Sequence, residues 1–143
     1  MAESNTIVVG IDGSKTSRSA LRWAADEANR RGSEVVAVTA WAPVLPPVTS
    51  GDTAPHTAPS KPRDDAADEL LQTIVDELGE NPPVKVQPVV KEGNPARVLI
   101  DASGDADLLV VGTRGYGGFA GLLLGSVSQQ VAAHADCTVV VVR

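Results

Sequence analysis

The sequence predicts an α/β fold, a three-layer sandwich in which helices cover both faces of a five-stranded parallel sheet. Short runs of valine, isoleucine and leucine alternate along the chain with segments whose apolar residues recur at helical spacing; this alternation is typical of parallel sheets. The runs lack a polar residue at every second position, which indicates strands buried on both faces. With 143 residues and 43% apolar content, the chain suits one domain with a sizeable core. We therefore expect a single domain over residues 1–143.

The first elements form a strand, helix, strand unit. Residues 6–11 are a β-branched run, and a helix is expected from about residue 17 to residue 31. Arginines in its last turn and the following Gly32 favour a helix end there. A second β-branched run, Glu34–Trp41, predicts the next strand. The crossover between these two strands should be right-handed.

The middle of the chain begins with a proline-rich stretch. Residues 43–62 contain six prolines among small polar residues, which predicts an irregular surface loop; a loop of this length can also serve as a lid over a binding site. An amphipathic helix is expected over Arg63–Leu78, with acids opposite the apolar side. Its expected buried stripe consists of Ala67, Leu70, Leu71, Ile74, Val75 and Leu78.

Three strands and two helices complete the chain. Residues 84–90 form the expected third strand, and Pro88 places it at or near a sheet edge because proline cannot donate to a ladder. Asn94 before Pro95 is a typical helix start, and that helix should reach about residue 103. Residues 108–111 predict the fourth strand, residues 126–135 a helix, and residues 138–142 the fifth strand.

A strand order of 3-2-1-4-5 follows if the first three strands fill one side of the sheet and the last two fill the other. In such sheets a ligand crevice forms where the order reverses, at the carboxyl ends of the strands. The loops that meet there follow strands one and four. They contain Asp12 and the glycine-rich residues 112–126.

Composition excludes several classes of function. A net charge of −6 with a pI near 4.8 disfavours binding to nucleic acids or anionic membranes. The apolar runs are too short to span a bilayer, and the first residues lack the features of a signal peptide. Cys137 is the single cysteine, which rules out an internal disulfide and favours a reducing compartment. We expect a cytoplasmic protein that binds neither nucleic acid nor membrane.

Residues 112–126 are the strongest functional signal. Six of the thirteen glycines fall in this stretch, between the fourth strand and the next helix. Glycine lets the backbone approach a ligand closely, and successive amides can form an anion-binding nest. We expect Ser126 to cap the helix, with the positive end of the helix dipole facing the loop. An ordinary surface loop is disfavoured, because solvated linkers seldom carry leucine and phenylalanine.

Two known phosphate motifs do not fit this loop. A P-loop requires lysine and then serine or threonine after its second glycine, but Gly118 and Phe119 follow Gly117. A dinucleotide-binding turn should open its helix directly, whereas here the helix is expected only at Ser126. The spacing that does fit is Gly112-x2-Gly115-x9-Gly125-Ser126.

This spacing resembles the signature of the ATP-binding branch of the universal stress protein family, and the resemblance extends from the first strand to the last residue. It implies a Rossmann-like sheet with the order 3-2-1-4-5. It also implies that the three glycines and Ser126 bind phosphate, that Asp12 lies near the adenosine, and that backbone groups at Ala40 meet the adenine. The remaining candidates for nucleotide contacts lie beside these positions: Gly10, Thr113, Arg114, Gly117, Gly118 and Val127.

Magnesium is expected to accompany ATP. Arg114 is the one lysine or arginine between Arg97 and Arg143; it can pair with a phosphate through two hydrogen bonds, or it can remain a solvated loop arginine. The other charges of the ATP tail then require Mg²⁺ held mostly by phosphates and water. No cluster of carboxylates suggests a metal site made by the protein itself.

Binding is better supported than catalysis. Hydrolysis needs a group to orient water and a group to stabilise charge, and the loop carries no carboxylate, histidine or lysine. We predict an ATP-binding module for stress response or signalling, with slow or no hydrolysis. One alternative is a genuine ATPase or phosphotransferase with Asp12 as the acid and Arg114 as the charge stabiliser. Another is a dimeric scaffold whose nucleotide is incidental.

A homodimer through the fifth strand is also expected. Residues 138–142 are apolar on both faces and would lie at the sheet edge. An uncovered apolar edge strand favours pairing with another chain. The family resemblance also implies a symmetric dimer through this strand.

Overall fold

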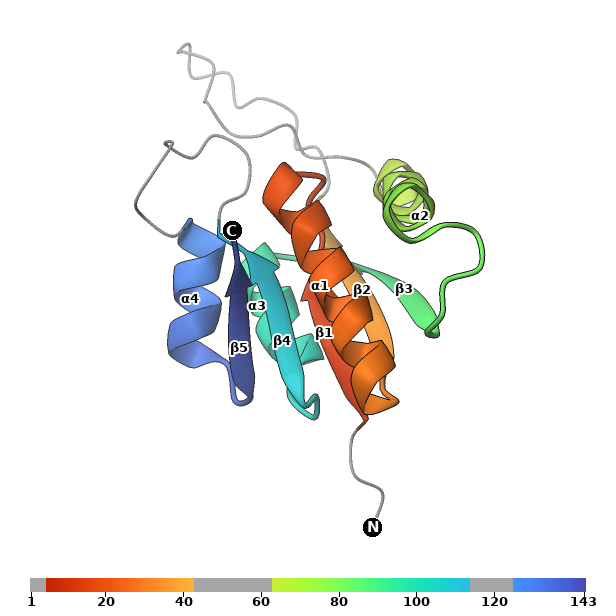
Figure 1. The fold of residues 1–143 in the computed structure, drawn as a ribbon. Helices are drawn as coiled ribbons and strands as arrows, with labels where there is room; N and C mark the ends of the chain where they lie inside the picture. The colour runs from red at the N-terminus through yellow and green to blue at the C-terminus, as the bar shows by residue number, and fades with distance from the viewer. Residues whose placement is uncertain (1–4, 43–62, 114–124) are drawn as a thin grey trace.

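The computed structural model describes residues 5–42, 63–113 and 125–143. The proline-rich stretch at 43–62 and four of the candidate site residues, Arg114, Gly115, Gly117 and Gly118, lie outside the described residues. Strands and helices alternate along the described chain (Figure 1). The elements are β1 (Thr6–Gly10), α1 (Lys15–Arg31), β2 (Glu34–Trp41), α2 (Arg63–Leu78), β3 (Val86–Glu92), α3 (Pro95–Ala102), β4 (Leu108–Gly112), α4 (Ser126–His134) and β5 (Thr138–Val142).

The sheet has five parallel strands in the order β3-β2-β1-β4-β5, which confirms the predicted fold class and strand order. Central β1 pairs with β2 on one side, where Thr6 lies opposite Glu34, and with β4 on the other, where Ile7 lies opposite Leu108. The order therefore reverses between β1 and β4.

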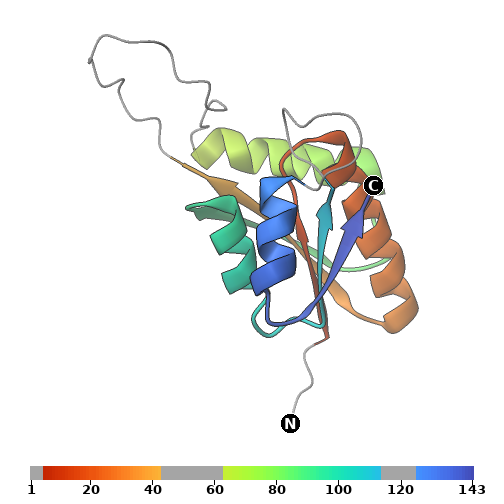
Figure 2. The same cartoon turned by 90° about the vertical axis from the view of Figure 1, so that its left-hand side faces the viewer.

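Helices cover both faces of the sheet. Helices α1 and α2 lie on one side, and α3 and α4 on the other (Figures 1 and 2). Successive residues of β1 point to opposite layers: Ile7 and Val9 pack in the core under α1 and α2, whereas Val8 packs in the core under α3 and α4. Because each face needs its own apolar residues, the strand reads as a continuous apolar run.

The largest differences from the predicted element boundaries are two-residue shifts at α1 and β3, and one-residue differences occur at the ends of β1, α3, β4 and α4. Helix α1 begins two residues early, at Lys15, because the Ser14 side chain caps it by accepting a hydrogen bond from the Ser17 amide (3.3 Å). Strand β3 is shifted by two residues, since its pairing with β2 starts at Val86 opposite Val35. Helix α4 ends at His134.

The predicted buried face of α2 is wrong in part, because the observed face is rotated around the helix axis from the expected one. Leu71 and Val75 are 50% and 43% exposed, and the buried residues are Ala66, Leu70, Thr73 and Ile74. Helix α2 packs over β2 and the edge strand β3. Since little sheet lies beyond β3, the helix buries a narrower face than its apolar pattern suggests.

Pro88 is tolerated in β3 because of the direction its backbone nitrogen faces. The Val35 amide donates to the Lys85 carbonyl and the Gly93 amide donates to the Trp41 carbonyl. Odd-numbered residues of β3 therefore face β2, and Pro88 faces outward, where no ladder donor is needed. Its missing N–H also leaves a gap in the outer edge, which disfavours pairing with another strand.

No helix in the described part of the chain is long and apolar enough to cross a membrane.

Candidate functional site

A pocket opens at the carboxyl ends of β1, β2 and β4, where the strand order reverses. Its volume of about 110 Å³ is several times the ~10–15 Å³ that one buried water requires. The lining residues are Gly10, Ile11, Asp12, Ser14, Ser17, Val38, Ala40, Pro95, Leu99, Val111, Gly112, Val127 and Ser128. The pocket is therefore large enough to receive part of a ligand.

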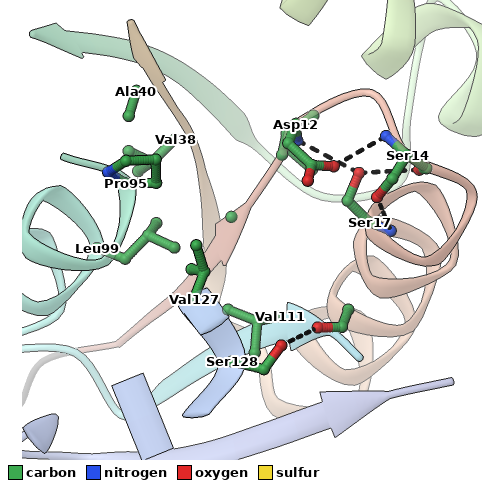
Figure 3. Close-up of a pocket in the computed structure, with 13 residues that line it drawn as sticks. Asp12, Ser14, Ser17, Val38, Ala40, Pro95, Leu99, Val111, Val127 and Ser128 are labelled. Atoms are coloured by element: carbon green, nitrogen blue, oxygen red, sulfur yellow. Dashed lines mark hydrogen bonds between the residues drawn. The ribbon is translucent and has the colours of Figure 1, made fainter. Parts of the chain in front are cut away.

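One wall of the pocket is apolar. Val38 and Ala40 come from β2, Pro95 and Leu99 from α3, and Val127 from α4, and Figure 3 shows them gathered on the side away from α1. Leu99 is only 6% exposed and packs over Gly10, where an added Cβ would lie 2.6 Å from Leu99 Cδ1. The part of this wall formed by Val38, Ala40 and Leu99 suits a flat apolar group such as a nucleobase.

The opposite wall is polar and belongs to the start of α1. Asp12 Oδ1 accepts a hydrogen bond from the Ser14 amide (2.8 Å), and the Asp12 amide donates to Ser17 Oγ (3.3 Å). Ser17 Oγ in turn donates to the Ser14 carbonyl (3.0 Å; Figure 3). The bond from the Ser14 amide orients the exposed Asp12 carboxylate, and the other two bonds fix the backbone around it.

Three helices begin at this pocket. Ser14 caps α1, Pro95 is the first residue of α3, and Val127 lies in the first turn of α4, and all three line the pocket. Helix N-termini carry partial positive charge and amides without partners inside the helix. The pocket therefore offers favourable electrostatics for an anion although the protein is acidic overall.

Gly112 is required by packing. A Cβ at this position would lie 2.7 Å from the Thr16 carbonyl carbon and 2.8 Å from the Ser17 amide nitrogen. Both are backbone atoms and cannot turn aside. The end of β4 and the start of α1 therefore approach closely only because residue 112 is glycine.

Five of the sequence-predicted site residues line the pocket together: Gly10, Asp12, Ala40, Gly112 and Val127. Thr113 and Gly125 lie beside it, joined by a hydrogen bond from the Gly125 amide to the Thr113 carbonyl (2.6 Å).

The expected capping role of Ser126 is wrong. Gly125 is the N-cap of α4: its backbone is extended, and its carbonyl accepts from the Gln129 amide (2.9 Å). Ser126 is the first helical residue, is exposed, and makes no side-chain cap.

Sequence reasoning missed two groups of pocket residues. Ser14, Ser17 and Ser128 are polar and occupy the N-cap or the first turn of a helix, and their position after strands one and four was an available signal. The second group is apolar. Its members on α3 could not be predicted from the sequence, because packing decides which side of this helix faces the pocket. Its members are Ile11, Val38, Pro95, Leu99 and Val111.

A model of the universal stress protein family matches residues 3–143. The chain belongs to the universal stress protein family. A universal stress protein from Mycolicibacterium smegmatis is 40% identical over 138 residues, which covers 96% of this chain and 45% of the relative. This universal stress protein thus spans about half the length of the curated relatives it matches.

Two solved structures illustrate the similarity of fold. The universal stress protein UspA from Lactobacillus plantarum is similar with a TM-score of 0.74 and 22% identity, and the match covers all of both chains. A universal stress protein in complex with cAMP is similar with a TM-score of 0.68 and 26% identity, over 99% of this chain and 98% of that one.

Proposed function

We propose that this universal stress protein binds an adenine nucleotide in the pocket between β1 and β4. We expect ATP with Mg²⁺, and a role as a nucleotide-dependent stress-response or signalling module with slow or no hydrolysis. The observation that carries the proposal is the juxtaposition of an apolar wall, a fixed carboxylate and three helix N-termini around one pocket.

Each part of the pocket matches one part of a nucleotide. The apolar wall formed by Val38, Ala40 and Leu99 suits the base. The Asp12 carboxylate is an acceptor for ribose hydroxyls. First-turn amides of α4 suit phosphate oxygens, with Mg²⁺ compensating the remaining charge. A structure of a family member in complex with cAMP, an adenine nucleotide, supports the same class of ligand.

Binding is favoured over turnover by the chemistry of the lining. Asp12 is the one titratable side chain among the described pocket residues, and its Oδ1 already accepts from the Ser14 amide. Rapid phosphoryl transfer requires groups that position the nucleophile and stabilise the transferred charge. Among the described residues, no cluster of three or more histidines, cysteines or acids is arranged to hold a metal ion.

Calorimetric titration of the protein with ATP, ADP, AMP and adenosine in millimolar Mg²⁺ tests the proposal. We expect saturable heat with the adenine nucleotides and weaker binding of ATP when EDTA removes the metal. GTP is the control for base recognition. The absence of heat with every adenine nucleotide would contradict the proposal, and rapid single-turnover hydrolysis that Asp12→Ala abolishes without loss of ATP binding would favour the enzyme instead.

We also propose a homodimer through β5. This strand ends the sheet, and its four valines are each half-buried. The Val142 carbonyl accepts from the Thr113 amide (2.8 Å), so alternation directs the backbone groups of Val139 and Val141 away from β4. The opposite edge, β3, carries the interruption at Pro88. Of the two edges, β5 is therefore the one suited to pairing with a second copy.

Val139→Pro should convert the dimer to a monomer. The substitution removes an outward N–H from β5 in the way that Pro88 does on β3, while the ladder to β4 keeps its donors. Light scattering after size exclusion measures the mass. Val139→Ile, which retains the N–H, should stay dimeric, and an unchanged mass for Val139→Pro would count against pairing through β5.

A further inference from the structure

The two ends of the glycine-rich loop meet at a set of hydrogen bonds centred on Thr113. Its carbonyl accepts from the Gly125 amide (2.6 Å), and its own amide donates to the Val142 carbonyl at the end of β5 (2.8 Å). Residues 114–124 connect Thr113 to Gly125 along the chain. The loop therefore starts and finishes at adjoining points that are tied to the sheet.

Ser128 adds a side-chain bond to this junction. Its Oγ lies 2.6 Å from the Gly112 carbonyl oxygen and 3.1 Å from the Thr113 carbonyl oxygen (Figure 3 shows the side chain directed to the end of β4). A hydroxyl has one proton, so it is shared between the two carbonyls with the shorter contact dominant. The bond joins the first turn of α4 to residues fifteen and sixteen positions earlier in the chain.

Packing alone does not explain a serine at this position. Ser128 is 3% exposed, and an alanine would fill nearly the same space without a polar atom to satisfy. Burial of a hydroxyl is unfavourable unless it is hydrogen-bonded, and here both acceptors belong to the loop junction. Serine side chains near a helix start more often bond within their own turn. The Ser128 hydroxyl instead fixes α4 to the end of β4.

We propose that Ser128 is a positioning residue for phosphate binding: its hydroxyl holds the carbonyls of Gly112 and Thr113 against the first turn of α4, and so sets where the amides at that helix start lie relative to β4. The effect on ligands rests on the proposed nucleotide binding. The proposal assigns the phosphates to the amides and the base to the apolar wall. Loss of the Ser128 hydroxyl should therefore weaken the binding of ATP and leave the binding of adenosine unchanged.

Ser128→Ala should weaken ATP binding about three- to tenfold, the loss that corresponds to one intramolecular hydrogen bond, and leave adenosine binding within about twofold. Ser128→Thr retains the hydroxyl and should restore ATP affinity. Ser128→Cys keeps the size with a weaker donor and should behave like alanine, which provides a second variant if alanine lowers the yield of folded protein. The matched control is Ser103→Ala, since Ser103 is also buried and donates to the Ile100 carbonyl (3.1 Å) away from the pocket.

Amide hydrogen exchange in the ligand-free protein tests the junction independently of any nucleotide. In Ser128→Ala the Gly125 and Thr113 amides should exchange at least about threefold faster, while Ser103→Ala leaves both rates unchanged. If the wild-type protein binds no adenine nucleotide, the proposed function fails and the exchange rates still decide the role of Ser128. Unchanged exchange at Gly125 and Thr113, or an equal loss of ATP and adenosine affinity, would overturn the positioning role.

Discussion

Gly112→Ala should lower the free energy of unfolding by about 2–3 kcal/mol, near the upper end for overpacking a rigid site. The added Cβ would lie 2.7 Å from the Thr16 carbonyl carbon and 2.8 Å from the Ser17 amide nitrogen. Relief requires the whole start of α1 to move away from β4, because no side-chain rotation separates two backbones. Chemical denaturation measures the change, and for a chain of this length the melting temperature should fall by about 5–10 °C.

Two other glycines provide controls for this prediction. Gly104→Ala places its Cβ 3.7 Å from the Asp101 carbonyl oxygen, an ordinary contact, so its effect should stay within about 0.5 kcal/mol. Gly10→Ala meets the Cδ1 atom of Leu99 at 2.6 Å, but that atom ends a flexible side chain, so we expect an intermediate loss. If Gly112→Ala were as stable as Gly104→Ala, the close approach of α1 to β4 would not be the reason for glycine.

The parallel strands were predictable because their determinants are local, whereas their order rested on the assumption that the first three strands fill one side of the sheet and on the family resemblance. Unbroken apolar runs such as Leu108–Val111 identify strands buried on both faces, and helices between them force parallel connections. The face that α2 buries could not be predicted from the local sequence. Ile74 belongs both to the expected stripe and to the observed one, and the choice between Leu71 and Ala66 depends on how far the sheet extends beneath the helix.

The pocket was predictable to the extent that strand ends define it. Asp12 lies two residues after β1, Ala40 is the last but one residue of β2, and Gly112 ends β4, so all three lie at the carboxyl ends of neighbouring strands. Leu99 and Ser128 escaped prediction because their roles depend on helix rotation and on partners far along the chain: Leu99 covers Gly10, and Ser128 bonds Gly112. The reason for glycine at position 112 was also missed. Its spacing from the other glycines suggested phosphate contact, whereas the close approach of its backbone to α1, far away in the sequence, already requires glycine.

Val127→Asp should weaken ATP binding about five- to thirtyfold. Val127 is half-buried in the pocket wall at the second helical position of α4, where the phosphates are proposed to lie. Two unit charges about 6 Å apart near a protein surface interact by about 3 kcal/mol at an effective dielectric of about 20, and Mg²⁺ and salt reduce this repulsion to roughly 1–2 kcal/mol. Calorimetric titration measures the dissociation constant.

Val127→Asn separates charge from shape in this test. Aspartate and asparagine have nearly the same size, so the two variants should bind uncharged adenosine equally. Only their affinities for ATP should differ. Loss of fold cannot account for the difference, because an acid in the first turn favours the helix through its dipole. The ratio of ATP affinities should also shrink as salt is raised. Equal ATP affinity for the two variants would show that the phosphates do not lie at the start of α4, and the base and ribose would then be the parts of the ligand that this pocket receives.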